Sequence, residues 1–261
     1  MPSSYAHYRF GCQLLRRLPQ SVLSVIKPYR SLYDFGLHGP DPFFYYNPAK
    51  PNKIGKLGSS LHRLSGVDFF GRCVRKLKMD PSPAAESYLY GVLAHYCLDS
   101  TCHPSIVKWT EEGIAGHSEI ETEFDRYLLE HDGRVPPHAQ DVSPHMRITR
   151  QESKIVAPFY TPATPEEVYR SSLNMTRITH LLSLPDGPGR KFVSAAANAL
   201  GSVPRQMVMP DKPNPCCTDL DPVLLSLYDQ ALDACPGMVQ QLQAMISGNT
   251  PLGKEFVPPF G

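Results

Sequence analysis

Two histidines and an aspartate recur at four-residue intervals in an apolar segment of the chain. His95, Asp99 and His103 lie in SYLYGVLAHYCLDSTCH, which follows Glu86 and carries no fixed charge before Asp99. Residues four apart share one face of a helix, and a helix that is apolar all round is expected to be buried. A buried carboxylate is costly unless it is paired or bound to a metal. Taken alone, this pattern fits a metal site and a hydrogen-bonded pairing of Asp99 with His95 or an arginine equally well.

A second histidine and carboxylate, His117 and Glu121, have the same spacing in the segment HSEIETEFDRYLLE. At about 100° per residue, both fall within the arc that is defined by Ile120, Phe124 and Leu128. We therefore expect this pair to point into the core as well. The other charged side chains placed on this helical wheel fall outside the arc and are expected to face solvent: Glu119, Glu123 and Arg126.

Two helices that each present an imidazole and a carboxylate at this spacing predict a dinuclear metal site. Imidazole nitrogen together with carboxylate oxygen suits Zn²⁺, whereas Mg²⁺ and Ca²⁺ prefer oxygen ligands. Cys102 lies slightly round the helix from this face and is expected to pack in the core. Buried histidine–acid pairs in a helical bundle without a metal remain the alternative.

The composition is that of an ordinary globular protein, with 26 lysines and arginines against 25 aspartates and glutamates. This balance gives no electrostatic reason to expect nucleic acid or a strongly anionic membrane as an obligatory partner. No segment approaches the roughly 20 apolar residues that span a bilayer, and the first residues do not resemble a secretory signal. The seven cysteines lack the spacing of a disulfide framework. We expect a cytoplasmic protein with reduced thiols, whose oligomeric state the composition leaves open.

Helix-start signals dominate the chain, and alternating strand patterns are scarce. Ser82-Pro83, Thr164-Pro165 and Asp221-Pro222 each place a capping residue before a proline at the first helical position. Glu167 completes a capping box with Thr164. Pro236-Gly237 is expected to interrupt the helix that begins near Asp221.

The spacing of these signals predicts an all-α protein, a multi-helix bundle in a single domain that covers residues 1–261. We expect residues 1–130 to carry the metal motifs, and residues 150–261 to complete the bundle with helices and a C-terminal tail. Loops are expected between the helices, over residues 35–53, 131–163 and 202–220.

The motifs His95-x-x-x-Asp99, His103-Pro104 and His117-x-x-x-Glu121 together resemble the zinc-dependent phospholipase C family. That family includes secreted bacterial enzymes that cleave phosphatidylcholine, and the fungal single-strand zinc nucleases share its fold. The opening SYAHYRFG and the loop GLHGPD are similar to its bacterial branch. The resemblance covers about residues 1–130, and it implies the multi-helix fold of the family.

The resemblance also implies which residues bind zinc. One ion would be held by Asp41, His62, His95 and Asp99, and a second by His103, His117 and Glu121. A third would use His7 and the other oxygen of Asp99. In the secreted enzymes, the amine of an N-terminal tryptophan completes this third site. This chain begins Met1-Pro2 and has its one tryptophan at position 109. The expected number of zinc ions is therefore two or three.

The function implied by the resemblance is a zinc-dependent phosphodiester hydrolase of the phospholipase C type. A metal-activated water would attack the phosphodiester, and Asp41 would serve as both ligand and general base. Two alternatives stay open: a single-strand nuclease, which the balanced charge disfavours, and a non-catalytic protein that keeps zinc for structure or sensing. The substrate would be a phosphodiester, with a phospholipid head group as one candidate.

The remaining ionisable residues give weaker signals. His38 adjoins the GPD motif and is expected in a tight turn. Asp34, Asp68 and Asp125 are expected to face solvent or cap helices, and the aromatic run FFYY at 43–46 fits either a wall beside the metals or core packing. Four further histidines without a ligand partner at short spacing are expected at the surface: His131, His138, His145 and His180.

Overall fold

The computed structural model describes residues 4–248 and 250–261, and this part of the chain is built from helices without a named strand. The α-helices are α1 (Ser4–Leu14), α2 (Gln20–Ile26), α3 (Arg30–Gly36), α4 (Lys53–His62), α5 (Gly66–Met79), α6 (Pro83–Glu111), α7 (His117–His131), α8 (Arg150–Val156), α9 (Pro165–Leu182), α10 (Pro188–Leu200), α11 (Ser202–Gln206) and α12 (Asp221–Ser247). Short 3₁₀ helices accompany them: η1 (Lys27–Tyr29), η2 (Asp41–Tyr45), η3 (Pro137–Ala139), η4 (Pro144–Met146), η5 (Ala157–Tyr160) and η6 (Lys254–Phe256). The all-α class predicted from the sequence is confirmed.

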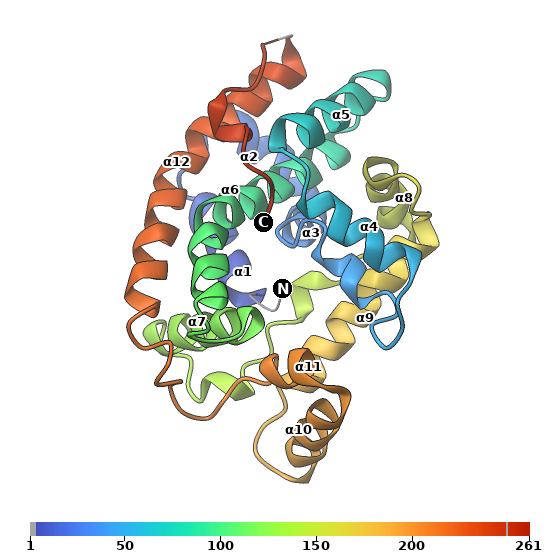
Figure 1. Ribbon diagram of the computed structural model, residues 1–261. Coiled ribbons are helices and arrows are strands. Elements are labelled where there is room, and N and C mark those ends of the chain that lie inside the picture. The colour runs from blue at the N-terminus through green and yellow to red at the C-terminus, as the bar shows by residue number, and fades with distance from the viewer. Residues whose placement is uncertain (1–3, 249) are drawn as a thin grey trace.

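Helix α6 runs through the middle of the molecule, and α1, α2, α3 and α12 pack against it (Figure 1). Nearly every residue from Ala84 to Asp99 is buried, as expected for a helix without an exposed polar face. Where α3 crosses α6, a Cβ on Gly91 would lie 2.1 Å from the carbonyl oxygen of Tyr33. Only glycine fits this backbone contact, which fixes the end of α3 and the loop that follows it against α6.

Two of the three predicted helix starts have the expected capping bonds. The Ser82 hydroxyl accepts the Ala85 N–H, and Thr164 forms a reciprocal capping box with Glu167. The third differs, because Asp221 is the first residue of α12, is buried and makes no capping bond. Because of these caps, α6 and α9 begin at the residues that the sequence indicates.

The predicted interruption of α12 at Pro236-Gly237 is wrong, since the helix continues through Pro236 to Ser247. Proline has no N–H for the carbonyl four residues earlier, which here belongs to Leu232. The Arg17 guanidinium donates to that carbonyl oxygen at 3.2 Å instead. A tertiary contact therefore replaces the missing helical bond.

Two of the predicted loops also contain helices. Helix α8 lies within 131–163 and begins with a capping box between Thr149 and Glu152. Helix α11 lies within 202–220. Within the described residues, none of the helices combines the length and the apolar character needed to cross a bilayer.

Residues 253–261, called the C-terminal strap from here on, return to the middle of the helical bundle, where the chain's end lies in Figure 1. The hydroxyl of Tyr96 on α6 lies within hydrogen-bond distance of two strap carbonyls, those of Glu255 and Pro258. Phe260 is fully buried, with its ring 4.9 Å from that of Tyr96. The strap is thus packed on the same helix that carries the predicted ligands.

Candidate metal centre

Helices α1 and α6 bring His7, His95 and Asp99 together in the core. The two carboxylate oxygens of Asp99 lie 3.1 Å from His7 Nε2 and 3.0 Å from His95 Nε2. The two imidazole rings stack with their centroids 4.4 Å apart. All three side chains are buried. One carboxylate thus lies between two histidines that are distant in sequence.

The loop after α3 adds Asp41, and the end of α4 adds His62. His62 Nε2 lies 2.9 Å from Asp41 Oδ1, and His95 Nε2 lies 3.9 Å from the same oxygen. His62 Nδ1 lies 2.8 Å from the carbonyl oxygen of Gly58, a contact in which Nδ1–H donates and Nε2 is left facing the carboxylate. Gly39 has φ +47°, and a Cβ there would lie 2.3 Å from the His95 ring. The GLHGPD loop therefore packs its backbone directly on a predicted ligand.

The third group joins the end of α6 to the start of α7. His103 Nε2 and His117 Nε2 each lie 3.3 Å from Glu121 Oε1. His103 Nε2 is also 3.6 Å from Asp99 Oδ1, which connects this group to the first. The His117 side chain is 34 % exposed, so the cluster reaches solvent at this end. All eight residues expected from the sequence therefore converge on one connected group, which we call the central cluster.

The central cluster suits a metal better than it suits ordinary ion pairs. No lysine or arginine among the described residues pairs with its three carboxylates, which are those of Asp41, Asp99 and Glu121. His95 Nε2 is buried, and although Asp99 Oδ2 lies 3.0 Å away, the two do not have the geometry of a hydrogen bond. Ligands of a tetrahedral zinc at about 2.0–2.1 Å lie about 3.3 Å from one another. Most of the separations given above are close to this value, so the residues fit zinc.

Electrostatics favours the charged forms of four members of the cluster despite burial: His7, His62, Asp99 and His103. Burial raises the pKa of Asp99, but the surrounding histidines lower it further, so that it lies well below its ordinary value. Burial lowers the pKa of His103, yet Asp99 and Glu121 raise it to about 9. The pKa values of His7 and His62 are also raised, against burial, by neighbouring aspartates. Without a metal, protons on His7, His62 and His103 offset the charge of the carboxylates, and a divalent ion can replace those protons.

The outer face of α7 differs from the sequence-based expectation. Glu119 is partly exposed, but Glu123 and Arg126 are both buried, so their expected exposure is wrong. Arg126 Nε donates to Glu123 Oε1 at 2.6 Å, and its Nη1 donates to Glu130 at 2.9 Å. The segment before α12 covers this face, with the Asn214 amide donating to Glu119. A helix packed on two sides buries polar residues that a one-sided helical wheel assigns to solvent.

The sequence also predicts surface, turn or capping positions for several further histidines and for Asp125. His131 and His180 are exposed as expected, whereas His138 is buried and His145 is half-buried. His145 stacks on Tyr8, and its Nε2 lies 2.9 Å from Nε2 of His38, which occupies the expected turn. Asp125 caps α1 by accepting two backbone N–H groups, those of Tyr5 and Ala6.

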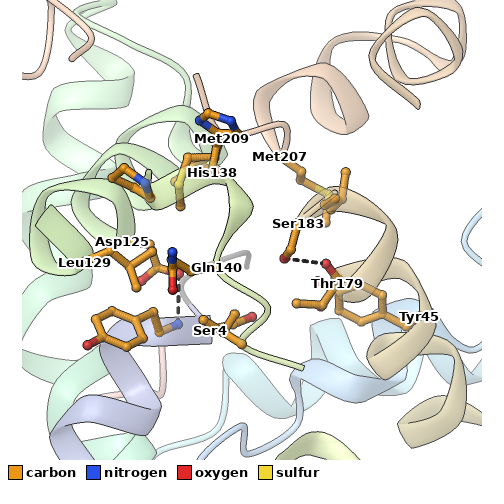
Figure 2. Close-up of a pocket in the computed structure, with 15 residues that line it drawn as sticks. Ser4, Tyr45, Asp125, Leu129, His138, Gln140, Thr179, Ser183, Met207 and Met209 are labelled. Atoms are coloured by element: carbon orange, nitrogen blue, oxygen red, sulfur yellow. Dashed lines mark hydrogen bonds between the residues drawn. The ribbon is translucent and has the colours of Figure 1, made fainter. Parts of the chain in front are cut away.

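A small cavity of about 50 Å³ lies near the central cluster (Figure 2). Thr122, the residue after Glu121, belongs to its lining, and so does Tyr45. Burial and the nearby carboxylates of Asp41, Glu121 and Asp125 raise the pKa of Tyr45. Figure 2 shows Tyr45, Thr179, Ser183 and Met207 on one wall, opposite Asp125, Leu129 and His138. The FFYY run is therefore divided: Tyr45 lines this cavity, while Phe43 packs in the core against Tyr160.

A family model described as zinc dependent phospholipase C matches residues 6–164, more than half of the chain. The chain belongs to the zinc-dependent phospholipase C family. The match includes all eight residues of the central cluster and extends beyond the segment in which the sequence resemblance was found. Helices α9 to α12 lie after its end. No curated protein and no solved structure matches the chain significantly.

Proposed function

We propose that this member of the zinc-dependent phospholipase C family is a phosphodiester hydrolase whose central cluster holds two or three zinc ions. The observation that carries the proposal is the convergence of three buried carboxylates and five histidines without a lysine or arginine among the described residues. Zinc bound there would polarise the phosphodiester and lower the pKa of water toward about 7. The proposed ligands are His7, Asp41, His62, His95, Asp99, His103, His117 and Glu121.

The chain's own groups would orient the reaction. Asp41 is proposed to accept the proton of the attacking water, since its carboxylate lies at the edge of the cluster next to His62. The Gly58 carbonyl holds the His62 ring in place, and the Gly39 turn holds that of His95. These contacts fix the imidazoles before substrate binds, which limits the reorganisation that the reaction requires.

We propose that the cavity of Figure 2 marks the side from which the substrate approaches the central cluster. The Thr122 hydroxyl is buried and has no hydrogen-bond partner within the described residues, which leaves it available to a phosphodiester or its leaving group. Leu129, Leu182, Met207 and Met209 make much of the remaining lining apolar. A polar group near the metals and an apolar wall beyond it suit a phospholipid-type substrate.

The same lining argues against the nuclease alternative. It contains no lysine or arginine among the described residues, whereas proteins that bind single strands use cationic grooves along the backbone. The partial exposure of His117 argues against a closed structural zinc site, because such sites exclude solvent and substrate.

Metal analysis and parallel assays test the proposal. Protein purified without added metal should contain two or three zinc ions per chain, and it should hydrolyse phosphatidylcholine and a chromogenic phosphodiester faster than single-stranded DNA. Zinc-free protein after careful repletion would contradict the metal site. Zinc-loaded protein that is inactive on all three substrates would instead support the non-catalytic alternative, and a preference for DNA would support the nuclease.

A further inference from the structure

Helices α10 and α11, residues 188–206, form what we call the α10–α11 lobe, at the edge of the molecule in Figure 1. Ala197 is the one residue of α10 that is buried. Phe192 is 74 % exposed and Leu200 71 %, and these two residues, eight apart, lie on the same side of the helix. Val203, at the start of α11, is 56 % exposed. Large apolar side chains gathered in one short segment mark an interaction surface rather than a random distribution.

The lobe also carries unpaired positive charge. Lys191 and Arg205 are exposed, and neither forms an ion pair with another described residue. Arg190 is instead engaged by two aspartates, Asp186 and Asp211. Residues 188–206 contain three cationic residues and no acidic residue, although the net charge of the whole chain is only +1. Apolar side chains next to lysine and arginine are typical of helices that lie in the interface of an anionic bilayer.

The residues just before and just after the lobe line the cavity. Leu182 and Ser183 precede α10 and line the cavity, as do Met207 and Met209, which follow α11. Arg190 donates to the Met209 carbonyl at 2.7 Å, which ties α10 to that lining. The exposed apolar residues thus belong to a segment that begins and ends at the cavity wall (Figures 1 and 2).

We propose that the α10–α11 lobe docks the protein on an anionic phospholipid bilayer, with Phe192, Leu200 and Val203 entering the interface and Lys191 and Arg205 facing the head groups. Docking there brings the cavity wall to the lipid surface. The inference rests on the proposed function, since it makes a bilayer lipid the substrate. The other strongly exposed apolar residues do not form such a group, because they lie on separate elements: Met79, Val135 and Val257.

Vesicle binding tests the inference without relying on catalysis. The zinc-loaded protein is sedimented with vesicles of phosphatidylcholine and phosphatidylserine, and with vesicles of phosphatidylcholine alone. We expect binding to the anionic vesicles that weakens with salt. The double variant Phe192→Ser/Leu200→Ser should bind about 100-fold more weakly, because two large apolar side chains leave the interface. The matched control Met79→Ser/Val257→Ser, which removes equally exposed apolar residues elsewhere, should bind like the unmodified protein.

A charge variant and two substrates complete the experiment. Lys191→Glu/Arg205→Glu should abolish the preference for anionic vesicles. Phe192→Ser/Leu200→Ser should lose hydrolysis of vesicle lipid but keep that of a water-soluble chromogenic phosphodiester. If vesicle binding follows these variants while neither substrate is hydrolysed, the docking surface stands and the proposed function fails.

Three results would overturn the inference. The first is equal vesicle binding by the Phe192→Ser/Leu200→Ser variant and its Met79→Ser/Val257→Ser control. The second is no binding to anionic vesicles by the unmodified protein. The third is concentration-dependent dimerisation without lipid that the Phe192→Ser/Leu200→Ser variant abolishes in light scattering, which would assign the face to a second copy of the chain.

Discussion

The two faces of α7 both bury a carboxylate, but they neutralise it differently. Glu123, on the outer face, is paired with the permanent cation of Arg126 at 2.6 Å. Glu121, on the inner face, has two histidines within 3.3 Å and no lysine or arginine among the described residues. An arginine keeps its charge at any ordinary pH, whereas a histidine can give up its proton to a metal. Burial alone therefore does not distinguish the proposed metal ligand Glu121 from Glu123, but the type of cation beside each carboxylate does.

A group near the α10–α11 lobe follows the same rule. His138 lies 3.2 Å from Asp186 and 3.4 Å from Asp211, which gives it the composition of a metal site. Arg190 forms ion pairs with Asp186 at 3.5 Å and with Asp211 at 2.8 Å, so a permanent cation already neutralises these carboxylates. We therefore assign it to holding the lobe rather than to a metal.

The largest effect is expected in the central cluster. Replacing Asp99 with Asn removes a carboxylate that faces His7, His95 and His103 while keeping its shape. We expect loss of bound zinc and a fall in activity of ~10³-fold or more, because transition-state charge loses its metal. Zinc per chain is measured by elemental analysis, with circular dichroism as the control for folding. An Asp99→Asn protein with full zinc content would contradict the assignment.

The outer pair should respond in stability and not in metal. Arg126→Met leaves Glu123 buried without its cation, which should cost about 3 kcal/mol in the free energy of unfolding while zinc content stays unchanged. The double variant Glu123→Gln/Arg126→Met should regain most of that loss, since position 123 no longer carries a buried charge and Glu130, the other partner of Arg126, is exposed. Denaturant unfolding provides the measurement. Loss of zinc in the single variant, despite a folded protein, would remove the distinction between the two faces.

A change in the C-terminal strap is expected to have a smaller effect on the central cluster. A Cβ on Gly261 would lie 1.7 Å from His103 Nδ1, so the Gly261→Ala variant must displace the ring or the strap. We expect zinc affinity to fall by ~10-fold, a typical cost of disturbing a ligand's outer contact. The control Gly237→Ala adds the same methyl group to open space on α12. Equal affinities in a zinc titration of the two variants would show that the strap does not position His103.

The smallest expected effect depends on pH and involves Asp221, near the outer pair. Burial and the charge of Glu123 raise the pKa of Asp221 from 3.8 to about 7, against the effect of Arg126. The folded protein therefore holds a proton there that the unfolded chain releases, so stability falls as pH rises from about 4 to about 7 and stays reduced above. Asp221→Asn should raise Tm by ~2–4 °C at pH 8 and leave it unchanged at pH 4. An equal shift at both pH values would show that ionisation is not the cause.

The sequence predicts those parts of this molecule that depend on local spacing. The intervals between His95, Asp99 and His103, and between His117 and Glu121, define helical faces, and the structure brings these faces together. The capped starts of α6 and α9 are local in the same sense. The zinc assignment itself stays a prediction until metal is measured.

The departures from prediction arise from contacts between distant segments. Glu123 is buried because the segment before α12 covers the second side of α7. Helix α12 continues through Pro236, where Arg17 donates to the Leu232 carbonyl that lacks its helical N–H partner. His138 is buried close to Asp186 and Asp211, which lie far along the chain. The strap has no short-range signal at all, since Tyr96 contacts it across 162 positions.

The end of the strap also bears on how the protein can be handled. Gly261 donates its N–H to the His62 carbonyl at 3.2 Å and lies against the His103 ring, so whatever follows this residue starts beside two of the proposed ligands. A histidine tag joined there would present competing imidazoles to the same ions. Fusion partners are therefore better placed elsewhere, and a long linker after Gly261 is the minimum if that end must be used.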